Sequence, residues 1–320
     1  MSRPNQRASG PSTRRQATLL KVPATRQCQY RVVFPTSRLL RAVHESNRQG
    51  RDGWDRFAPH RERVQALLAG CATDGSSLCV LGPGNLNDVR LDELLDRFAE
   101  VHLVDIDVAA VRFGVARQAV AGRGGCVLHE PTDLTGVLDL LAAGTGAGLV
   151  ARLSGLRCTV AGGPFDVTVS TGVLTQLLQS VVDSPLPRED VVPVSLALRD
   201  KHLRDLVGLT RPGGAVVLVT DVVSTATAPR LQQVDAADLE PEMASLVAAG
   251  NFFTGANPYR IVALFEEHPR LRRQVTDVRL VDPWMWAVTP DREHLTCAIV
   301  ARRVERWHRQ PTLNLSRALR

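Results

Sequence analysis

A glycine turn followed by two acids is the part of this chain best suited to chemistry. Gly82 and Gly84 come directly after the apolar run 79–81, and glycine lets a backbone turn tightly and approach a ligand where a Cβ would collide. Asp105 and Asp107 follow a second apolar run. An acid about 20 residues after such a turn is where open α/β sheets place a carboxylate for ribose hydroxyls. The spacing therefore predicts a nucleotide or nucleoside site.

The segment between the turn and the acids must position them, and its pattern is that of a helix lying on a sheet. Leu91, Leu94, Leu95 and Phe98 recur at helical spacing. Val101, Leu103, Val104 and Ile106 make a second, mostly apolar strand. The order strand, turn, helix, strand and acid predicts a nucleotide-binding βαβ unit.

The glycine spacing separates two classes of ligand. A dinucleotide site uses G-x-G-x-x-G, but Asn87 stands where the third glycine belongs. Asp88 adds a negative charge near the place of a pyrophosphate, which disfavours NAD and FAD. An acid is better tolerated beside a ligand that carries an amino group or a sulfonium.

The stretch 81–107 resembles the first two strands of the class I S-adenosylmethionine (SAM)-dependent methyltransferases. Their first motif has the form acid-x-G-x-G-x-G, and this chain departs from it with Val80 in place of the acid and Leu86 in place of the last glycine. The resemblance implies that the turn meets the methionine portion of SAM, that Asp105 holds the ribose, and that Asp107 is the reserve candidate. The cofactor-binding positions it implies are Gly82, Pro83, Gly84, Asn85, Asp88, Asp105, Asp107, Asp133, Ser170 and Thr171.

One of these positions allows a second interpretation, and one further acid is a candidate base. Asp133 matches the family position that faces the adenine amino group, but Asp133 or Thr135 equally suits the cap of a helix starting near residue 137. No catalytic base is evident. Asp221, at the end of the fifth predicted strand, stands where a base could be placed, although a strand-end Asp is commonly a cap or turn residue.

The remaining apolar runs supply the strand order that the resemblance requires. They are 125–129, 165–171, 215–220 after an R-P-G-G turn, 278–288 and 295–304. The last two are separated by a loop short enough for an antiparallel pair. We therefore expect an α/β fold: a single Rossmann-like methyltransferase domain with a mostly parallel seven-stranded sheet and a C-terminal antiparallel hairpin.

Several segments outside the sheet bear on the ligand site. An insertion at 222–274 is expected to form helices, either a lid that selects the substrate or additional packing helices. The helix-like segment 60–68 resembles the family's N-terminal helix, which often covers the cofactor. Trp284 and Trp286 share one face of a strand and suit either the core or an aromatic wall for the acceptor. Asn257 to Tyr259 is expected to be a turn.

Charge and composition divide the chain into a domain and two basic tails. Of 39 Lys and Arg residues, nine lie in 1–41, which has no acid, so the remainder carries 30 basic and 33 acidic residues. We expect residues 1–41 to be largely disordered, 42–305 to form the domain, and 306–320 to be a basic tail. Because the positive charge belongs to the tails, nucleic acid is not the expected partner.

The expected function is SAM-dependent methyl transfer to a small-molecule acceptor. The alternatives are a non-catalytic SAM-binding or scaffold protein, and a NAD-dependent oxidoreductase. The cysteines lack C-x-x-C spacing, no stretch is long enough to cross a membrane, and the histidines lack metal-site spacing. These features predict a cytoplasmic protein without a metal or membrane partner. The sequence does not indicate the oligomeric state.

Overall fold

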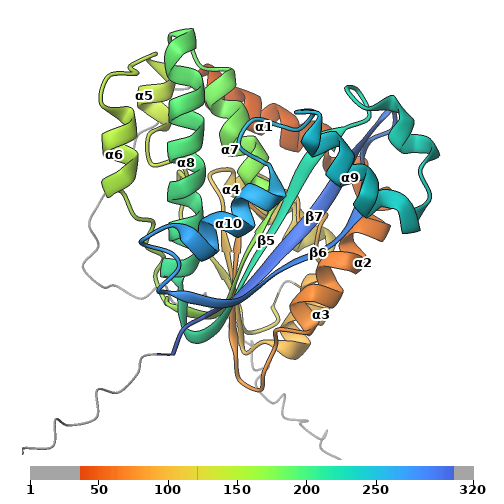
Figure 1. Ribbon diagram of the computed structural model, residues 1–320. Coiled ribbons are helices and arrows are strands. Elements are labelled where there is room, and N and C mark those ends of the chain that lie inside the picture. The colour runs from red at the N-terminus through yellow and green to blue at the C-terminus, as the bar shows by residue number, and fades with distance from the viewer. Residues whose placement is uncertain (1–36, 121, 306–320) are drawn as a thin grey trace, which may run out of the picture. The chain divides into compact units, whose positions relative to one another are not determined.

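The computed structural model describes residues 37–120 and 122–305 (Figure 1). The predicted tail 306–320 and residues 1–36 of the predicted tail 1–41 lie outside the described residues. The described chain begins with α1 at Arg38, four residues before the predicted domain boundary at 42, and the Ser37 hydroxyl accepts a hydrogen bond from the Leu40 amide to cap it.

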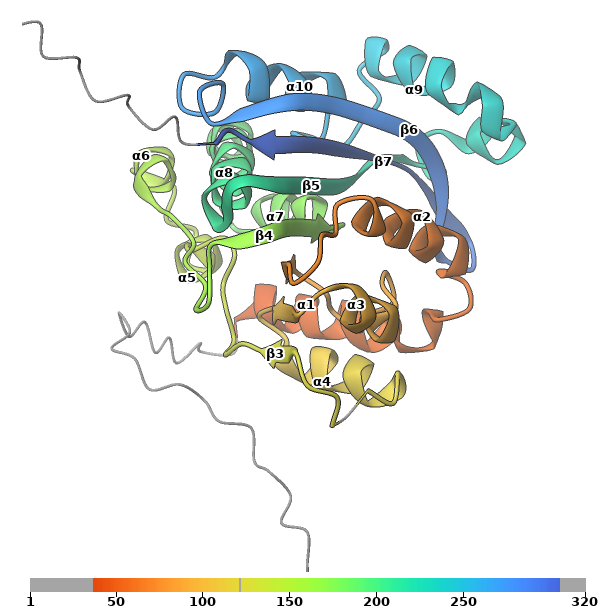
Figure 2. The same cartoon turned by 90° about the horizontal axis from the view of Figure 1, so that it is seen from below.

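The described residues form a seven-stranded sheet in the order β3-β2-β1-β4-β5-β7-β6. Neighbouring strands from β3 through β5 pair in parallel, whereas β7 runs antiparallel to both β5 and β6. Figure 2 shows β4, β5, β7 and β6 following one another in this order. The prediction of a mostly parallel seven-stranded sheet with a C-terminal antiparallel hairpin is therefore confirmed. The strands are β1 (Ser77–Leu81), β2 (Glu100–Val104), β3 (Cys126–Leu128), β4 (Phe165–Thr171), β5 (Thr210–Ser224), β6 (Val275–Thr289) and β7 (Arg292–Arg303).

Helices cover both faces of the sheet: in Figure 1, α7 and α8 lie on one side of the strands and α2 and α3 on the other. The helices of the described chain are α1 (Arg38–Gln49), α2 (Ala58–Ala69), α3 (Leu91–Arg97), α4 (Val108–Arg117), α5 (Leu138–Ala142), α6 (Leu149–Gly155), α7 (Val173–Val182), α8 (Arg188–Leu209), α9 (Leu239–Ala248) and α10 (Pro258–Glu267), with 3-10 turns at Arg51–Gly53, Pro229–Gln233 and Ala236–Asp238. No helix among the described residues is long and apolar enough to cross a membrane.

The main core lies between the sheet and the helices α2, α3 and α4. Val80 and Val169 from adjacent strands pack there with Val64 and Leu68 of α2 and Leu94 of α3. Alternating residues of a strand face opposite sides of a sheet, so the neighbouring positions in β4 and β5 face α7 and α8 instead. Val80, which replaces the acid of the family motif, is thus a core residue.

The segment 222–274 forms helices, as expected, and has a second small core. Met243 and Leu246 of α9 pack with Val222 of β5 and Leu295 of β7, while α10 packs on β6. The expected turn at 257–259 is instead the start of α10, because the Asn257 side chain accepts a hydrogen bond from the amide of Arg260 and caps the helix.

Candidate functional site

The helix α1 covers the glycine turn after β1. The Asn47 side chain donates to Asp107 Oδ2 over 3.0 Å, and the Asn47 carbonyl accepts from Asn85 Nδ2. In the same way, Asn87 Nδ2 donates over 2.8 Å to the carbonyl of Gly50, just after the helix. The segment 60–68 belongs to α2, in which Val64 and Leu68 pack in the core while His60 faces Asp88; that it lies over the cofactor stays a prediction.

The two acids after β2 have separate roles. Asp105 is 7% exposed; its Oδ2 accepts from the Gly84 amide at 2.9 Å and its Oδ1 from the Asp107 amide at 2.8 Å. Desolvation raises the Asp105 pKa, while these backbone hydrogen bonds lower it. Asp107 caps α4 by accepting from the amide of Ala110. Asp105 is therefore tied to the turn, whereas Asp107 holds a helix terminus.

The turn needs its glycines because protein side chains fill the space beside them. A Cβ at Gly82 would lie 1.7 Å from Val173 Cγ2, and one at Gly84 would lie 3.0 Å from Asn47 Oδ1. Both glycines have positive φ, and the Pro83 carbonyl accepts from the Leu86 amide to close the turn. The sequence predicts that a ligand approaches this turn closely; in the described structure, side chains of α7 and α1 lie beside it.

Leu86 replaces the third glycine of the family motif, and a glycine in α4 leaves room for its side chain. Leu86 has φ +55°, a conformation that glycine adopts without strain, and it is fully buried. Opposite it in α4 lies Gly114, where a Cβ would be 2.4 Å from the Asn85 carbonyl oxygen and 2.8 Å from Leu86 Cβ. The sequence analysis missed Gly114. A glycine on the face of a helix that follows the second strand was its only signal.

Asp88 lies apart from Asp105, on the side of β4 and β5. Its Oδ1 is 3.6 Å from Nε2 of His60 in α2. The Thr171 hydroxyl and the Asp221 carboxylate are also neighbours that influence its ionisation. We call the group His60, Asp88, Thr171, Asp221, Trp286 and His294 the carboxylate cluster. Thr171 ends β4 and Asp221 lies within β5, so the cluster occupies the carboxyl edge of these two parallel strands, the edge at which α/β sheets bind ligands.

The aromatic rings of the cluster fix the proton of His60. Trp284 Nε1 donates to His60 Nδ1 over 3.1 Å, so the neutral imidazole carries its proton on Nε2, facing Asp88. Trp286 stacks on His60 at 4.2 Å between centroids, and Phe57 meets Trp286 edge-on at 5.1 Å. Desolvation lowers the His60 pKa to about 4. The predicted aromatic pair therefore contributes to both the core and the site.

Asp221 is held by hydroxyl groups from neighbouring elements. Its Oδ1 accepts from Thr296 over 3.1 Å and its Oδ2 from Thr175 over 3.0 Å, while His294 Nδ1 lies 3.2 Å from Oδ2. The charge of Asp221 adds to desolvation in raising the Asp88 pKa to about 7. The sequence predicts Asp221 at the end of a strand, as a possible base or as a cap or turn residue, but β5 continues past it to Ser224 and that base stays a prediction.

Two predicted cofactor residues have other partners. The Ser170 hydroxyl lies 2.8 Å from His202 Nε2 of α8, on the opposite face of the sheet from Thr171. Asp133 accepts from the amides of Thr135 and Leu138 at the start of α5, which is the capping role considered as the alternative. The described structure thus brings Gly84, Asn85, Asp105 and Asp107 together under α1, with Asp88 and Thr171 in the carboxylate cluster.

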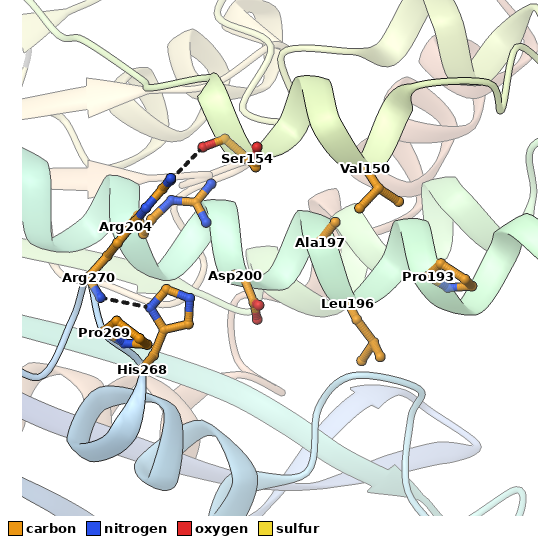
Figure 3. A pocket seen from close by; sticks show the side chains of 10 residues that line it. All are labelled: Val150, Ser154, Pro193, Leu196, Ala197, Asp200, Arg204, His268, Pro269 and Arg270. Carbon is orange, nitrogen blue, oxygen red and sulfur yellow. Dashed lines mark hydrogen bonds between the residues drawn. The ribbon is translucent and has the colours of Figure 1, made fainter.

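A cavity of about 480 Å³ lies elsewhere, between α6, α8 and the residues after α10 (Figure 3). Leu196 and Val150 supply apolar surface, while Arg204 donates to the Leu153 carbonyl and Arg270 to the Ser154 carbonyl. None of the residues lining it belongs to the glycine turn or to the carboxylate cluster.

No protein-family model and no curated protein matches the sequence. The solved structures with similar chains include the N-methyltransferase NodS from Bradyrhizobium japonicum with S-adenosyl-L-homocysteine (SAH), at 13% identity and a TM-score of 0.46, covering 83% of this chain and 99% of that one. They also include a SAM-dependent methyltransferase from Methanosarcina mazei, at 12% identity and a TM-score of 0.43, covering 75% and 97%. An rRNA methylase from Streptococcus thermophilus gives 9% identity and a TM-score of 0.39, covering 75% and 93%.

The fold assignment rests on the sheet itself, in which a reversed β7 is inserted between β5 and β6 after five parallel strands. The chain has the class I methyltransferase fold.

Within this methyltransferase fold, the glycine turn retains two buried acceptors without hydrogen-bond partners, the side-chain oxygens of Asn85 and Asn87. Buried acceptors of this kind can pair with a donor on a bound ligand. The turn and Asp105 together thus suit a ligand that offers an amino group and ribose hydroxyls.

Proposed function

We propose that this chain is a SAM-dependent methyltransferase. The observation that carries the proposal is the hydrogen bond from the Gly84 amide to Asp105, at the carboxyl edge of β1 and β2. The unpartnered side-chain oxygens of Asn85 and Asn87 belong to the same turn. Each carboxylate oxygen has two lone-pair sites, so Asp105 can keep its backbone hydrogen bonds and still accept from ribose hydroxyls.

The protein's part in the reaction is to position groups. SAM, when bound, supplies a methyl group already activated by its sulfonium. Gly84, Asn85 and Asp105 would hold the cofactor, while the residues at the ends of β4 and β5 would orient the acceptor and remove a proton. The exclusion of water by α1 and α2 would keep the reacting groups desolvated.

A small molecule is the acceptor that we propose. The carboxylate cluster is enclosed by α2, β6, β7 and the residues near Phe253, which contacts the His294 ring at 5.4 Å. Such enclosure favours a compact acceptor over a polymer. The excess of acids over Lys and Arg in residues 42–320 supports the same choice, because it offers no general attraction to nucleic acid.

Calorimetry with SAM, SAH and NAD tests the proposal on the wild type, on Asp105→Asn and on Asp74→Asn, whose carboxylate is exposed. We expect micromolar SAH binding by the wild type and by Asp74→Asn. Asp105→Asn should weaken it about tenfold, or about 1.4 kcal/mol, since one acceptor oxygen for the ribose is lost.

Other outcomes would contradict the proposal in different ways. Heat with NAD and none with SAM or SAH would favour an oxidoreductase. No heat with any of the three would favour a non-catalytic scaffold. An Asp105→Asn variant that binds SAH like the wild type would place the cofactor elsewhere.

A further inference from the structure

We propose that the carboxylate cluster is the acceptor subsite and that it takes an amine, whose nitrogen binds between Asp88 and Asp221 beside the Trp286 ring. This inference rests on the proposed methyl transfer and adds the chemical class of the acceptor. The residues concerned come from α2, the glycine turn, β4, β5, β6 and β7, so the fold brings together groups that lie far apart in the sequence.

Unpartnered polar atoms point to a ligand at this cluster. Asp88 Oδ1, His60 Nε2 and Trp286 Nε1 are shielded from solvent and have no hydrogen-bond partner. His60 is 1% exposed and Trp286 is 7% exposed, and His60 Nε2 faces Asp88 Oδ1 at 3.6 Å, beyond hydrogen-bonding distance. Buried polar atoms in folded proteins are almost always paired, so this group of donors and acceptors is free to pair with a bound molecule.

The charge of the cluster selects a cation. Asp88 and Asp221 are its acids, and its two histidines supply the only other titratable groups. His60 is neutral because the Trp284 N–H occupies Nδ1 and because desolvation lowers its pKa to about 4. The nearest guanidinium is that of Arg61, which donates to the carbonyls of Trp54 and Asn87 rather than to Asp88.

An ammonium group fits between Asp88 and Asp221 better than other classes of methyl acceptor do. It can donate to both carboxylates at once and lie against the face of Trp286. A carboxylate or phosphate would be repelled, and a neutral alcohol would add no positive charge beside the two acids. Asp88 and His294 have side-chain exposures of 13% and 15%, so the cluster reaches solvent at these two residues.

Asp88 is also placed to accept the proton. The groups facing it are His60 and Arg61 of α2, Thr171 of β4 and Asp221 of β5. Desolvation and the Asp221 charge raise its pKa to about 7, while Thr171 and Arg61 lower it. A carboxylate with a pKa near neutrality is a better base towards an ammonium than an ordinary aspartate is.

The step balances as follows. The ammonium gives one proton to Asp88, and the nitrogen lone pair forms a bond to the methyl carbon of SAM. The bond from that carbon to sulfur breaks, with its electron pair left on the sulfur, which becomes the neutral thioether of SAH. The products are an N-methylammonium and a protonated Asp88, which releases its proton to solvent through its exposed edge.

Tryptophan emission provides a test that does not depend on turnover. The SAH-saturated protein is titrated with phenethylamine and with 2-phenylethanol, its neutral analogue, and Trp286→Phe identifies the signal that comes from the cluster. We expect phenethylamine to change the emission and to bind at least tenfold more tightly than the alcohol. Asp88→Asn should remove this preference, whereas Asp74→Asn should keep it.

The pH dependence of amine binding and SAH calorimetry provide two further tests. Raising the pH from 6 to 8 on the wild type should tighten amine binding about tenfold, since Asp88 ionises across this range, and should leave alcohol binding unchanged. The inference is overturned by equal affinity for amine and alcohol, by no emission change at millimolar amine, or by an Asp88→Asn variant that keeps the preference. SAH calorimetry on Asp88→Asn should match the wild type, so loss of the amine site and loss of the cofactor site are distinguishable.

Discussion

At the scale of single residues, the most informative pair is Leu86 with Gly114. Leu86 takes a left-handed backbone conformation that a glycine would adopt freely, and its side chain is accommodated because Gly114 in α4 has none. The family motif is therefore not lost at this turn. In the family motif the last glycine leaves room within the turn itself, whereas here Gly114 of α4 leaves that room for the Leu86 side chain.

Gly114→Ala should disturb the glycine turn more than its size suggests. Its Cβ would meet the Asn85 backbone oxygen, which cannot rotate away, so we expect the unfolding free energy to fall by about 2 kcal/mol or more. SAH affinity should fall as well. Gly208→Ala is the matched control, because this helical glycine of α8 has nothing within 4 Å of its Cβ position and the change should stabilise by about 0.5–1 kcal/mol. Thermal unfolding and calorimetry measure both effects, and equal stability of the two variants would refute the packing argument.

At the scale of elements, α1 covers the glycine turn mainly through polar contacts. Only Leu39 and Leu40 are buried among its residues, while Asn47 bonds to Asp107 and Asn85. A helix held in this way should be among the first parts of the described chain to open.

Asn47→Ala should release α1 without unfolding the sheet. It removes the side-chain donor to Asp107, so we expect a loss of about 1 kcal/mol in local stability. Hydrogen exchange should become faster in residues 38–49 and at the glycine turn but not in β4 or β5. Ser46→Ala, at an exposed position of the same helix, is the control. Unchanged exchange at α1 in Asn47→Ala would show that other contacts hold the helix.

The elements differ in how far the sequence could predict them, and the reason is what stabilises each one. The central strands β1, β2, β4 and β5 were predictable because their apolar runs are buried on both faces; β4 was predicted over its full observed length, 165–171. The covering role of α1 was not predictable, since its contacts with the turn are made by polar side chains and backbone groups that hydrophobic periodicity does not register.

The residues of the candidate site also differ in how far the sequence predicts them. Asp105 follows from its position after a strand, whereas the partners of Asp88 do not. His60, Asp221 and Trp286 approach Asp88 only because α2, β5 and β6 converge, and no local pattern records that convergence. Ser170 and Thr171 were treated alike although adjacent strand residues face opposite sides.

At the scale of the whole molecule, buried titratable groups give stability a maximum near pH 6.5. Burial lowers the pKa values of His60 and His129 to about 4 and that of His202 to about 3, so the unfolded state binds more protons below pH 6.5 and stability falls on acidification. Asp88 has the opposite effect. Its raised pKa favours the folded state while it is protonated, and this stability is lost as the pH rises from about 4 to 7.

Asp88→Asn should therefore raise the melting temperature most at alkaline pH. At pH 8 the variant no longer has to bury a carboxylate, and a pKa difference of about 3 units corresponds to roughly 4 kcal/mol at most. Near pH 4 the two proteins should melt almost together. Thermal unfolding across this range measures the difference, and a constant difference at all pH values would contradict the assignment of the raised pKa to Asp88.

The contacts of α1 also have a kinetic consequence. A ligand that touches Gly84 and Asp105 must displace Asn47 from the same surface, so association would wait for the helix to open and would fall below the rate of diffusional encounter. The same helix, once closed again, would slow dissociation. Exchange of product for fresh cofactor, rather than the transfer of the methyl group, would then limit the turnover of the proposed methyltransferase.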